Sequence, residues 1–440
     1  MLTDTNVRSA QLVINEPSGT PLRKWEDVER TVSLAAKELP VTDMHTHLFS
    51  ADFKEQLLWG VDELLIYHYL TAEYFRYSEL SYDDFWKYSK QQQAELIWQE
   101  LFVKRSPVSE AASGVLTAFR RLGLDTSSRD INIYREAWKN RTASEQIDKV
   151  LAAARVKEVV MTNDPLDRSE REVWLHQGNT DTRFLGALRI DALLLNWTVA
   201  SAELAAMGYQ VEGEWNDGVS GEVRRFLKEW SAKVGALYIA ASLPGDVRFG
   251  GRDHLTAMLE EAVIPVCLEL GLPLGLMIGV RRQVNPSLKL AGDMSMKADL
   301  QLLEAVAVSH PDLQLLITVL ARENQHELTV LSRKFRNITL FGCWWFLHTE
   351  SMIQELTRFR TELLGFSYIP QHSDCRVLEQ LINKWEHSRT VISEVLVSKY
   401  KRVYESGWLL SEEDIVRDLN EWFGGRFAVV RQNAAKTKVR

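Results

Sequence analysis

The chain has 440 residues, of which 45% are apolar and 25% are charged. These are the proportions of a globular protein and exclude a disordered chain, and the length allows one large barrel with insertions or two domains. The net charge of −8 argues against nucleic acid or an anionic membrane as a partner. No apolar window approaches the roughly 20 residues of a membrane span, and the start lacks the apolar core of a signal peptide. Because its three cysteines lack metal-ligand spacing, we expect a soluble protein of the reducing cytoplasm.

Short apolar runs of β-forming residues recur along the chain, with amphipathic helical patterns between them from the second run onward. This alternation predicts an α/β fold in which eight parallel strands close into a (β/α)8 barrel. An open doubly wound sheet is the alternative, but its first strand is normally followed by a Gly-rich phosphate loop that this sequence lacks. The predicted strands are residues 40–45, 156–164, 183–191, 235–243, 272–279, 313–320, 337–342 and 366–371.

Two segments depart from the regular alternation. The first two predicted strands are separated by about 110 residues, too many for one crossover helix, and this stretch is rich in Trp, Tyr, Glu, Lys and Gln. It predicts a helical insertion at about residues 50–150, and residues 377–440 read as a helical tail. We therefore expect a single domain over residues 1–440, a distorted TIM-type barrel with a helical insertion after strand one and a helical C-terminal tail.

The first predicted strand ends in "PVTDMHTHLFS", which contains His45 and His47. Alternate side chains of a strand point to the same face, so the two imidazoles can converge on one ion. Asp374 follows strand eight, which lies beside strand one in a closed barrel. Two histidines and a carboxylate describe an open catalytic metal site. The alternative for Asp374 is the N-cap of the final helix.

Four arginines also follow predicted strands, at the end of the barrel where functional residues gather. A guanidinium binds a carboxylate through two parallel hydrogen bonds, so several arginines at one mouth predict an anionic, hydroxyl-rich substrate. Each arginine alone is more typical of a surface ion pair. These residues are Arg189, Arg282, Arg322 and Arg376.

Aromatic residues and histidines near the predicted mouth have two interpretations each. Trp344 and Trp345 are typical of core packing, but beside a sugar an indole offers a stacking face and an N–H donor. His68 and Tyr69 form a core pair by default, or carry protons if their loop returns over the mouth. His372 either supports the metal ligands or is an exposed loop histidine, and we favour the exposed position.

Six segments, taken together, resemble one enzyme family: "VTDMHTHLFS", "LLIYHYLTAEYFR", "VVMTNDPLD", "ALRID", "FGCWWF" and "PQHSDCR". They are similar to the uronate isomerases (glucuronate isomerases) of the amidohydrolase superfamily, in order from about residue 38 to about residue 410. The shorter bacillus-type branch is the most similar. The resemblance implies a distorted (β/α)8 barrel with one zinc-type ion. It also implies conversion of D-glucuronate to D-fructuronate and of D-galacturonate to D-tagaturonate through an enediolate.

The same resemblance implies roles for individual residues. The metal ligands are His45, His47 and Asp374. The residues that bind substrate or transfer protons are His68, Tyr69, Arg189, Arg376 and one of Trp344 and Trp345, and Arg282 keeps the place of an arginine of the family. From the chemistry of the reaction, Asp374 or a metal-bound water is a candidate base and Tyr69 a candidate acid. Arg322 is a further candidate for substrate binding because it follows a predicted strand. One departure is Met277, which stands where the longer isomerases have a histidine, so a second metal ion is not expected.

The sequence is also compatible with two other classes of function. A metal-dependent hydrolase of the same superfamily, such as a lactonase, would share the first ligands but would normally add histidines or a lysine on the middle strands. A non-catalytic sugar-acid binding protein would keep the arginines without needing the metal set. The partner we expect is a small uronate sugar as substrate, and we expect a homo-oligomer that binds neither nucleic acid nor membrane.

Overall fold

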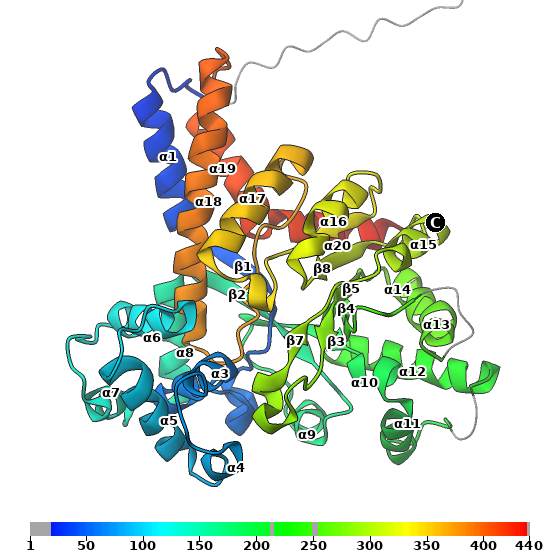
Figure 1. The fold of residues 1–440 in the computed structure, drawn as a ribbon. Coiled ribbons are helices and arrows are strands. Elements are labelled where there is room, and N and C mark those ends of the chain that lie inside the picture. The colour runs from blue at the N-terminus through cyan, green and yellow to red at the C-terminus, as the bar shows by residue number, and fades with distance from the viewer. Residues whose placement is uncertain (1–18, 212–214, 249–253, 438–440) are drawn as a thin grey trace, which may run out of the picture.

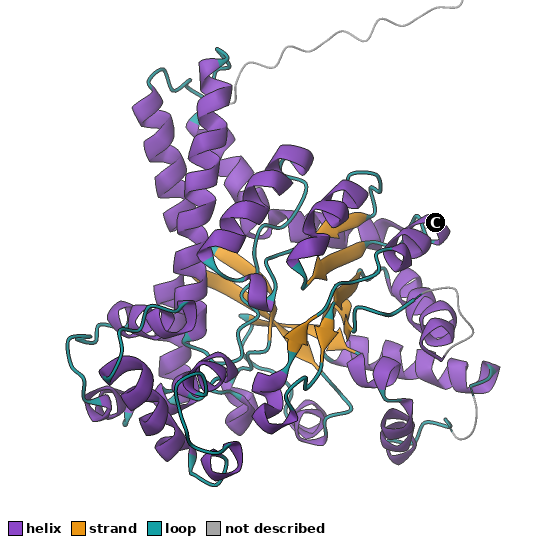
Figure 2. Cartoon of the chain, viewed as in Figure 1, coloured by secondary structure: helices purple, strands orange, loops and turns teal. Residues whose placement is uncertain are grey.

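The computed structural model describes residues 19–211, 215–248 and 254–437. Within these residues, seven parallel strands form one curled sheet that the helices surround (Figure 2). Its strand order is β1-β2-β3-β4-β5-β8-β9, which follows the chain as a barrel requires. The strands are β1 (Val41–Thr46), β2 (Val156–Asn163), β3 (Phe184–Arg189), β4 (Ala236–Leu243), β5 (Leu274–Ile278), β8 (Leu315–Val319) and β9 (Ile338–Leu340).

The eighth position of the barrel is occupied by an irregular segment rather than a strand. Ile369 forms a single parallel bridge with Phe341, just after β9. The chain then runs beside β1, where the His47 N–H donates to the Cys375 carbonyl at 2.7 Å. Pro370 has no N–H for a ladder, and Asp374 has a positive φ of 51°, so the segment cannot continue as a regular strand. The predicted distorted barrel is confirmed, but its predicted strand 366–371 is reduced to one bridge.

Alternation along the strands separates the core into two layers. On β2, Val159 and Met161 belong to the large cluster between sheet and helices, whereas Val160 between them belongs to a smaller cluster inside the barrel. Helix α20 (Arg426–Thr437) contributes Phe427 and Val430 to this inner cluster. The other buried members inside the barrel are Met44, Ala187, Tyr238, Ala240, Met277, Val280, Leu316, Leu320, Phe341, Trp344 and Ile369.

Helices follow the strands and cover the outside of the sheet (Figure 1). They are α9 (Arg168–His176), α10 (Asp191–Leu195), α11 (Trp197–Ala206), α12 (Asp217–Lys233), α13 (His254–Met258), α14 (Ile264–Leu270), α15 (Gln301–Ser309), α16 (Gln325–Ser332) and α17 (Glu350–Leu364).

The predicted insertion between the first two strands is a group of helices at the lower left of Figure 1. Side-chain caps define where several of these helices begin: Ser89 and Thr142 each accept from the backbone N–H three residues later and complete a capping box. The helices are α2 (Val61–Leu65), α3 (His68–Tyr74), α4 (Tyr82–Phe85), α5 (Lys90–Trp98), α6 (Glu110–Arg121), α7 (Ile131–Trp138) and α8 (Ala143–Ala154).

The helical tail is dominated by the 26-residue helix α18 (Gln380–Glu405), which runs beside α1 (Trp25–Glu38) and projects with it above the barrel in Figure 1. The same helix continues downward to the barrel, where it packs against α6 and α8 of the insertion. After it come α19 (Glu412–Asn420) and α20. Among the described residues, no helix combines the length and the apolar character that crossing a membrane requires.

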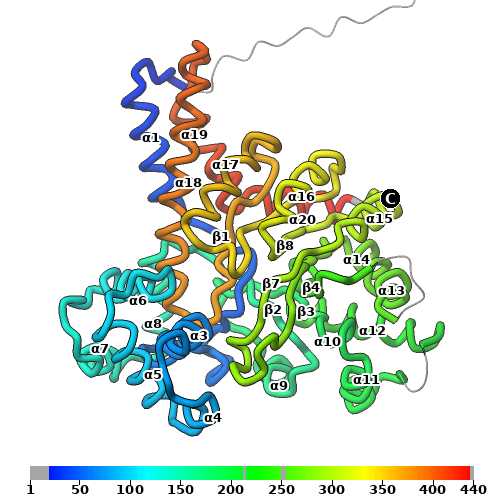
Figure 3. The backbone as a smooth tube through the Cα atoms, in the orientation of Figure 1, coloured from blue at the N-terminus to red at the C-terminus, as the bar shows by residue number. Residues whose placement is uncertain are grey.

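A short hairpin after β5 was not predicted. It pairs β6 (Val280–Arg281) with β7 (Met294–Ser295) in antiparallel register, and Figure 3 shows its chain running from the barrel toward α3. The Trp86 indole N–H donates to the Ser287 carbonyl of the hairpin loop at 2.8 Å. The hairpin therefore joins the barrel to the helical insertion.

Candidate active site

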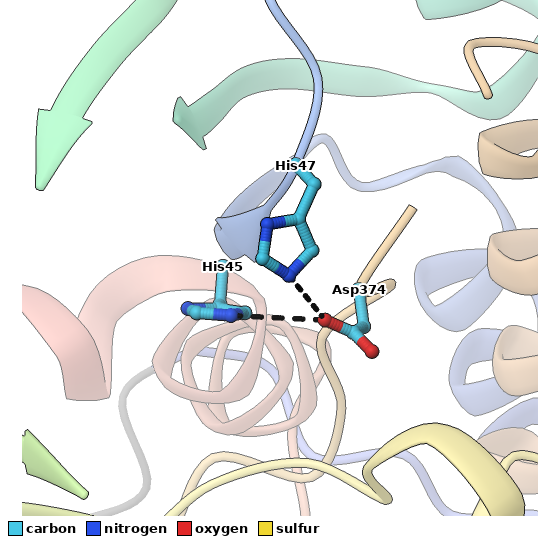
Figure 4. Close-up of side chains that lie close together, drawn as sticks. All are labelled: His45, His47 and Asp374. Carbon is cyan, nitrogen blue, oxygen red and sulfur yellow. Dashed lines mark ion pairs between the residues drawn. The ribbon is translucent and has the colours of Figure 1, made fainter. Parts of the chain in front are cut away.

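Three side chains converge where β1 meets the closing segment of the barrel. His45 projects from β1 and His47 directly follows its last residue, and their Nε2 atoms lie 3.7 and 3.3 Å from Oδ1 of Asp374 (Figure 4). One nitrogen or oxygen atom from each residue lies within 4.8 Å of the others. Among the described residues, no other group of three or more His, Cys, Asp or Glu side chains is this close.

Each imidazole is oriented by a hydroxyl group. The Tyr238 hydroxyl donates to the Met44 carbonyl at 3.0 Å, so it must accept the hydrogen of His45 Nδ1, which lies 2.7 Å away. In the same way, the Thr162 hydroxyl donates to the Thr46 carbonyl and accepts from His47 Nδ1 at 2.8 Å. Both histidines therefore carry hydrogen on Nδ1 and direct the lone pair of Nε2 toward Asp374.

The protonation states of the cluster suit a cation. Burial lowers the pKa of His45 and of His47 below the ordinary value, which keeps both imidazoles neutral. Burial raises the pKa of Asp374, but its contact with His47 and the positive charge of Lys384 act against this effect, and the pKa lies well below its usual range. His45 Nε2 and Asp374 Oδ1 are buried and have no hydrogen-bond partner in the described part of the chain. Two neutral imidazoles and one carboxylate are the donors of an open metal site, so the residues fit a divalent ion.

The local conformation of the chain aims Asp374 at the histidines. Helix α18 begins at Gln380 with Glu379 at its N-cap, so the alternative role of Asp374 as that cap is wrong. Asp43 shares the parity of the two histidines along β1, but its carboxylate accepts from the Ser373 N–H and the Trp385 indole instead. The pairing of β1 with β2 shifts register between Asp43 and Thr46, which removes Asp43 from the cluster.

His372 is fully buried, so the favoured expectation of an exposed loop histidine is wrong. Its ring lies edge-on to that of His45, with centroids 5.5 Å apart, and burial lowers its pKa to about 4. Gly342 makes room for it: a Cβ at that position would lie 1.7 Å from His372 Nδ1. The neutral imidazole thus packs as a wall of the cluster.

A second group of aromatic residues lies beside the cluster. The Trp345 indole N–H donates to His68 Nε2 at 3.0 Å, and burial lowers the pKa of His68 to about 3, so this imidazole is neutral with its hydrogen on Nδ1. Tyr69 packs edge-on against His68, and burial holds the pKa of its phenol well above the ordinary value. A phenol in this state can donate a proton but is not a base at neutral pH. Trp344, in contrast, is a buried member of the cluster inside the barrel.

The four predicted arginines lie in different surroundings. Arg189 is paired with Asp191 at 2.6 Å and influences the pKa of both clustered histidines. Arg376 is exposed, influences the pKa of His47, and has no carboxylate within ion-pair distance among the described residues. Arg282 is paired with Asp293 of the hairpin, and its side chain is 53% exposed.

Arg322 makes two hydrogen bonds to Glu355 on the outside of the barrel, and its side chain is 61% exposed. The charges of Arg189 and Arg376 therefore act on the clustered histidines, Arg282 lies in the neighbouring hairpin, and Arg322 lies in a surface ion pair.

A cavity of about 330 Å³ adjoins this aromatic group, between the insertion and α18. His68, Tyr69 and Trp345 line one side of it, and Lys384 lines it from α18. The residues of the metal cluster are not among its lining residues. Tyr238 and Lys384 are the main contributors to the site that the sequence did not indicate, because a tyrosine inside a strand and a lysine inside a helix carry no motif.

The fold of this chain is similar to that of solved isomerase structures. A uronate isomerase from Bacillus halodurans superposes with a TM-score of 0.92 and 47% sequence identity, covering 93% of this chain and 97% of that one. A uronate isomerase from Thermotoga maritima (TM-score 0.75, 16% identity, 92% and 98% covered) and a glucuronate isomerase from Caulobacter crescentus (0.75, 14%, 95% and 98%) share the fold. No protein-family model matches the sequence, and a search of curated proteins finds no match.

Proposed function

The chain belongs to the uronate isomerase family, and from this premise we propose that it interconverts the aldose and ketose forms of uronate sugars. The substrates are D-glucuronate, which gives D-fructuronate, and D-galacturonate, which gives D-tagaturonate. The observation that carries the proposal is the 47% identity to the uronate isomerase from Bacillus halodurans over nearly the whole of both chains. The cluster of His45, His47 and Asp374 supports it, because the family reaction needs a site for one divalent ion.

The reaction moves a carbonyl from C1 to C2 of the open-chain sugar. A proton leaves C2, an enediolate forms, and a proton returns to C1, so the site must stabilise negative charge on oxygen. A bound zinc ion, held by His45, His47 and Asp374, would supply that charge stabilisation.

The chain's own residues bind and orient the substrate. Arg376 has a guanidinium without a carboxylate partner among the described residues, which suits it to the substrate carboxylate, and Arg189 lies near the clustered histidines. Trp345 fixes the ring of His68, whose Nδ1–H is then free of that bond and can donate to a sugar oxygen. Tyr69 is protonated and is our candidate for the acid that returns a proton, while Asp374, which is ionised, is the candidate base.

We also propose that the bound ion is zinc, that the protein forms a homo-oligomer in the cytoplasm, and that residues 1–440 form a single domain. The hydrolase alternative receives no support from the middle strands, because Met277 on β5 is a buried apolar residue inside the barrel. A non-catalytic sugar-acid binder would not need the buried, mutually oriented imidazoles of His45 and His47.

The test uses both uronates and heavy water. Purified protein with added zinc is incubated with D-glucuronate and D-galacturonate in deuterated buffer, and the products are followed by NMR. We expect both ketoses, at least partly deuterated at C1, because the group that returns a proton to C1 exchanges its hydrogen with the solvent. A sugar lactone in a parallel reaction tests hydrolysis. No ketose from either sugar, with the fold confirmed by circular dichroism, would overturn the assignment.

A further inference from the structure

Lys384 is a buried cation beside the metal cluster. It has no role in the proposed reaction. It lies in the first turns of α18 and is 7% exposed. No carboxylate lies within ion-pair distance of its ammonium group in the part of the chain that the structure describes. Its Nζ donates instead to the Ser373 carbonyl at 2.5 Å. Burying an ammonium group without a carboxylate partner costs free energy of folding. The hydrogen bond to the Ser373 carbonyl offsets part of that cost.

The acceptor belongs to the peptide group that leads into Asp374. That group consists of the Ser373 carbonyl and the Asp374 N–H, and the N–H donates to the His45 carbonyl at 3.2 Å. Lys384 therefore fixes one end of the peptide plane, while β1 fixes the other end. Because a planar peptide has no internal freedom, its orientation sets the direction from which the Asp374 side chain leaves the backbone.

The preceding peptide is fixed from the other side. The Ser373 N–H donates to both carboxylate oxygens of Asp43, at 3.1 and 3.2 Å. Trp385, the neighbour of Lys384 on α18, donates its indole N–H to the same carboxylate at 2.8 Å. Two consecutive residues of one helix thus hold Ser373 through its carbonyl and, by way of Asp43, through its N–H.

The conformation that these contacts maintain is unfavourable by itself. Asp374 has a φ of 51°, in the left-handed region that a residue with a Cβ adopts only when its surroundings require it. In this conformation its Oδ1 lies 3.3 Å from His47 Nε2. Without the bond from Lys384, the Ser373 carbonyl would have no donor in the described residues and the peptide could rotate, which would move the carboxylate away from the histidines.

We propose that Lys384 is a positioning residue for the metal ligand Asp374: by holding the Ser373 carbonyl, its ammonium group fixes the carboxylate within reach of His45 and His47. This inference rests on the metal site of the proposed function but not on the sugar chemistry. Lys384 also lines the cavity shared with His68 and Tyr69, so the competing role is direct contact with substrate.

The test compares two buried cations of the same helix. Arg389 is 6% exposed and, like Lys384, donates to backbone carbonyls, those of Ala36 and Arg155, and none of its bonds in the described residues goes to a carboxylate. Lys384→Met and Arg389→Met both remove a buried charge and lose stability. Zinc affinity is measured by competition with a chromogenic chelator, and kcat and KM for D-glucuronate are measured with saturating zinc.

We expect Lys384→Met to bind zinc roughly tenfold or more weakly, as for other residues that orient a metal ligand, whereas Arg389→Met binds it like the unchanged protein. Lys384→Arg, which keeps a charged donor, should regain part of the affinity. At saturating zinc, kcat should fall while KM stays within about twofold.

Unchanged zinc affinity in Lys384→Met would overturn the proposal, and so would a defect confined to KM, which would instead assign Lys384 to substrate binding. If Lys384→Met does not fold, Lys384→Gln replaces it, because glutamine removes the charge with a smaller change in polarity. Its zinc affinity, kcat and KM test the proposal in the same way. Zinc affinity is measured without sugar. If the protein without substitutions makes no ketose, the proposed function is refuted, but the zinc affinities of the Lys384 and Arg389 variants still test the role of Lys384.

Discussion

The two halves of the metal cluster are built in different ways. On the β1 side, His45 belongs to a strand paired with β2 and His47 directly follows it, and hydroxyl groups of β4 and β2 orient their rings. On the other side, Asp374 belongs to a segment without regular pairing, which side chains of β1 and α18 hold in a left-handed backbone conformation. The histidine half therefore follows from secondary structure, whereas the carboxylate half depends on tertiary contacts.

This difference predicts how each half responds to substitution. The ladder between β1 and β2 keeps the backbone in place when one side chain changes, so losses on the histidine side should be local. The segment at 372–376 has few backbone partners, so losses there should spread to the position of the carboxylate itself. Substitutions on each side of the cluster therefore distinguish the two halves.

Asp374→Asn should have the largest effect, because it removes the only negative charge of the cluster while keeping the shape of the side chain. We expect close to one divalent ion per chain in the unchanged protein after mild dialysis, and far less than one in the variant. The loss of activity should exceed the roughly 10–100-fold typical of a supporting residue. Elemental analysis and a ketose assay measure both.

The control for this substitution is Asp148→Asn, which removes a carboxylate from an exposed ion pair with Arg183 on the outside of the protein. It should change neither metal content nor rate. Two tightly bound ions per unchanged chain, or an Asp374→Asn protein that retains its ion, would contradict the ligand set.

On the histidine half, Tyr238→Phe and Thr162→Val each remove one orienting hydroxyl and leave the side chain's shape nearly unchanged. Each should weaken metal affinity by roughly 10-fold, at the lower end of the range for such partners, because only one imidazole loses its orientation. Tyr368→Phe is the matched control, since that buried hydroxyl donates to the Thr357 carbonyl in another part of the core. Equal metal affinities in all three variants would show that the strand alone orients the rings.

Much of the histidine half could be predicted from the sequence. The alternation in "PVTDMHTHLFS" places His45 and His47 on one face, and the order of the apolar runs predicts the barrel that brings Asp374 beside them. The first seven predicted strands match the observed ones within a few residues at each end, whereas the eighth is reduced to a single bridge. These features depend on neighbouring residues or on the order of the strands along the chain. The pattern of apolar and polar residues in the sequence is therefore sufficient to predict them.

The remaining features depend on contacts between distant parts of the chain. The burial of His372 requires Gly342, and the positions of Tyr238 and Lys384 matter only because the barrel brings them to β1 and to Ser373. Arg322 shows the reverse case. It follows a strand as a site residue would, but the neighbouring helix α17 offers Glu355 as a partner.

The smallest effect we predict separates two of the four arginines. If Arg376 binds the substrate carboxylate through the planar fork of its guanidinium, lysine cannot replace it, because an ammonium group makes no pair of parallel hydrogen bonds. Arg376→Lys should lower kcat/KM by about tenfold, equivalent to about 1.4 kcal/mol, with little change in thermal stability. Arg322→Lys, in an ion pair at the surface, should leave kcat/KM unchanged. If both variants retain normal kinetics, the carboxylate must bind elsewhere, and Arg189 is the cation to change next, because its charge already acts on both clustered histidines.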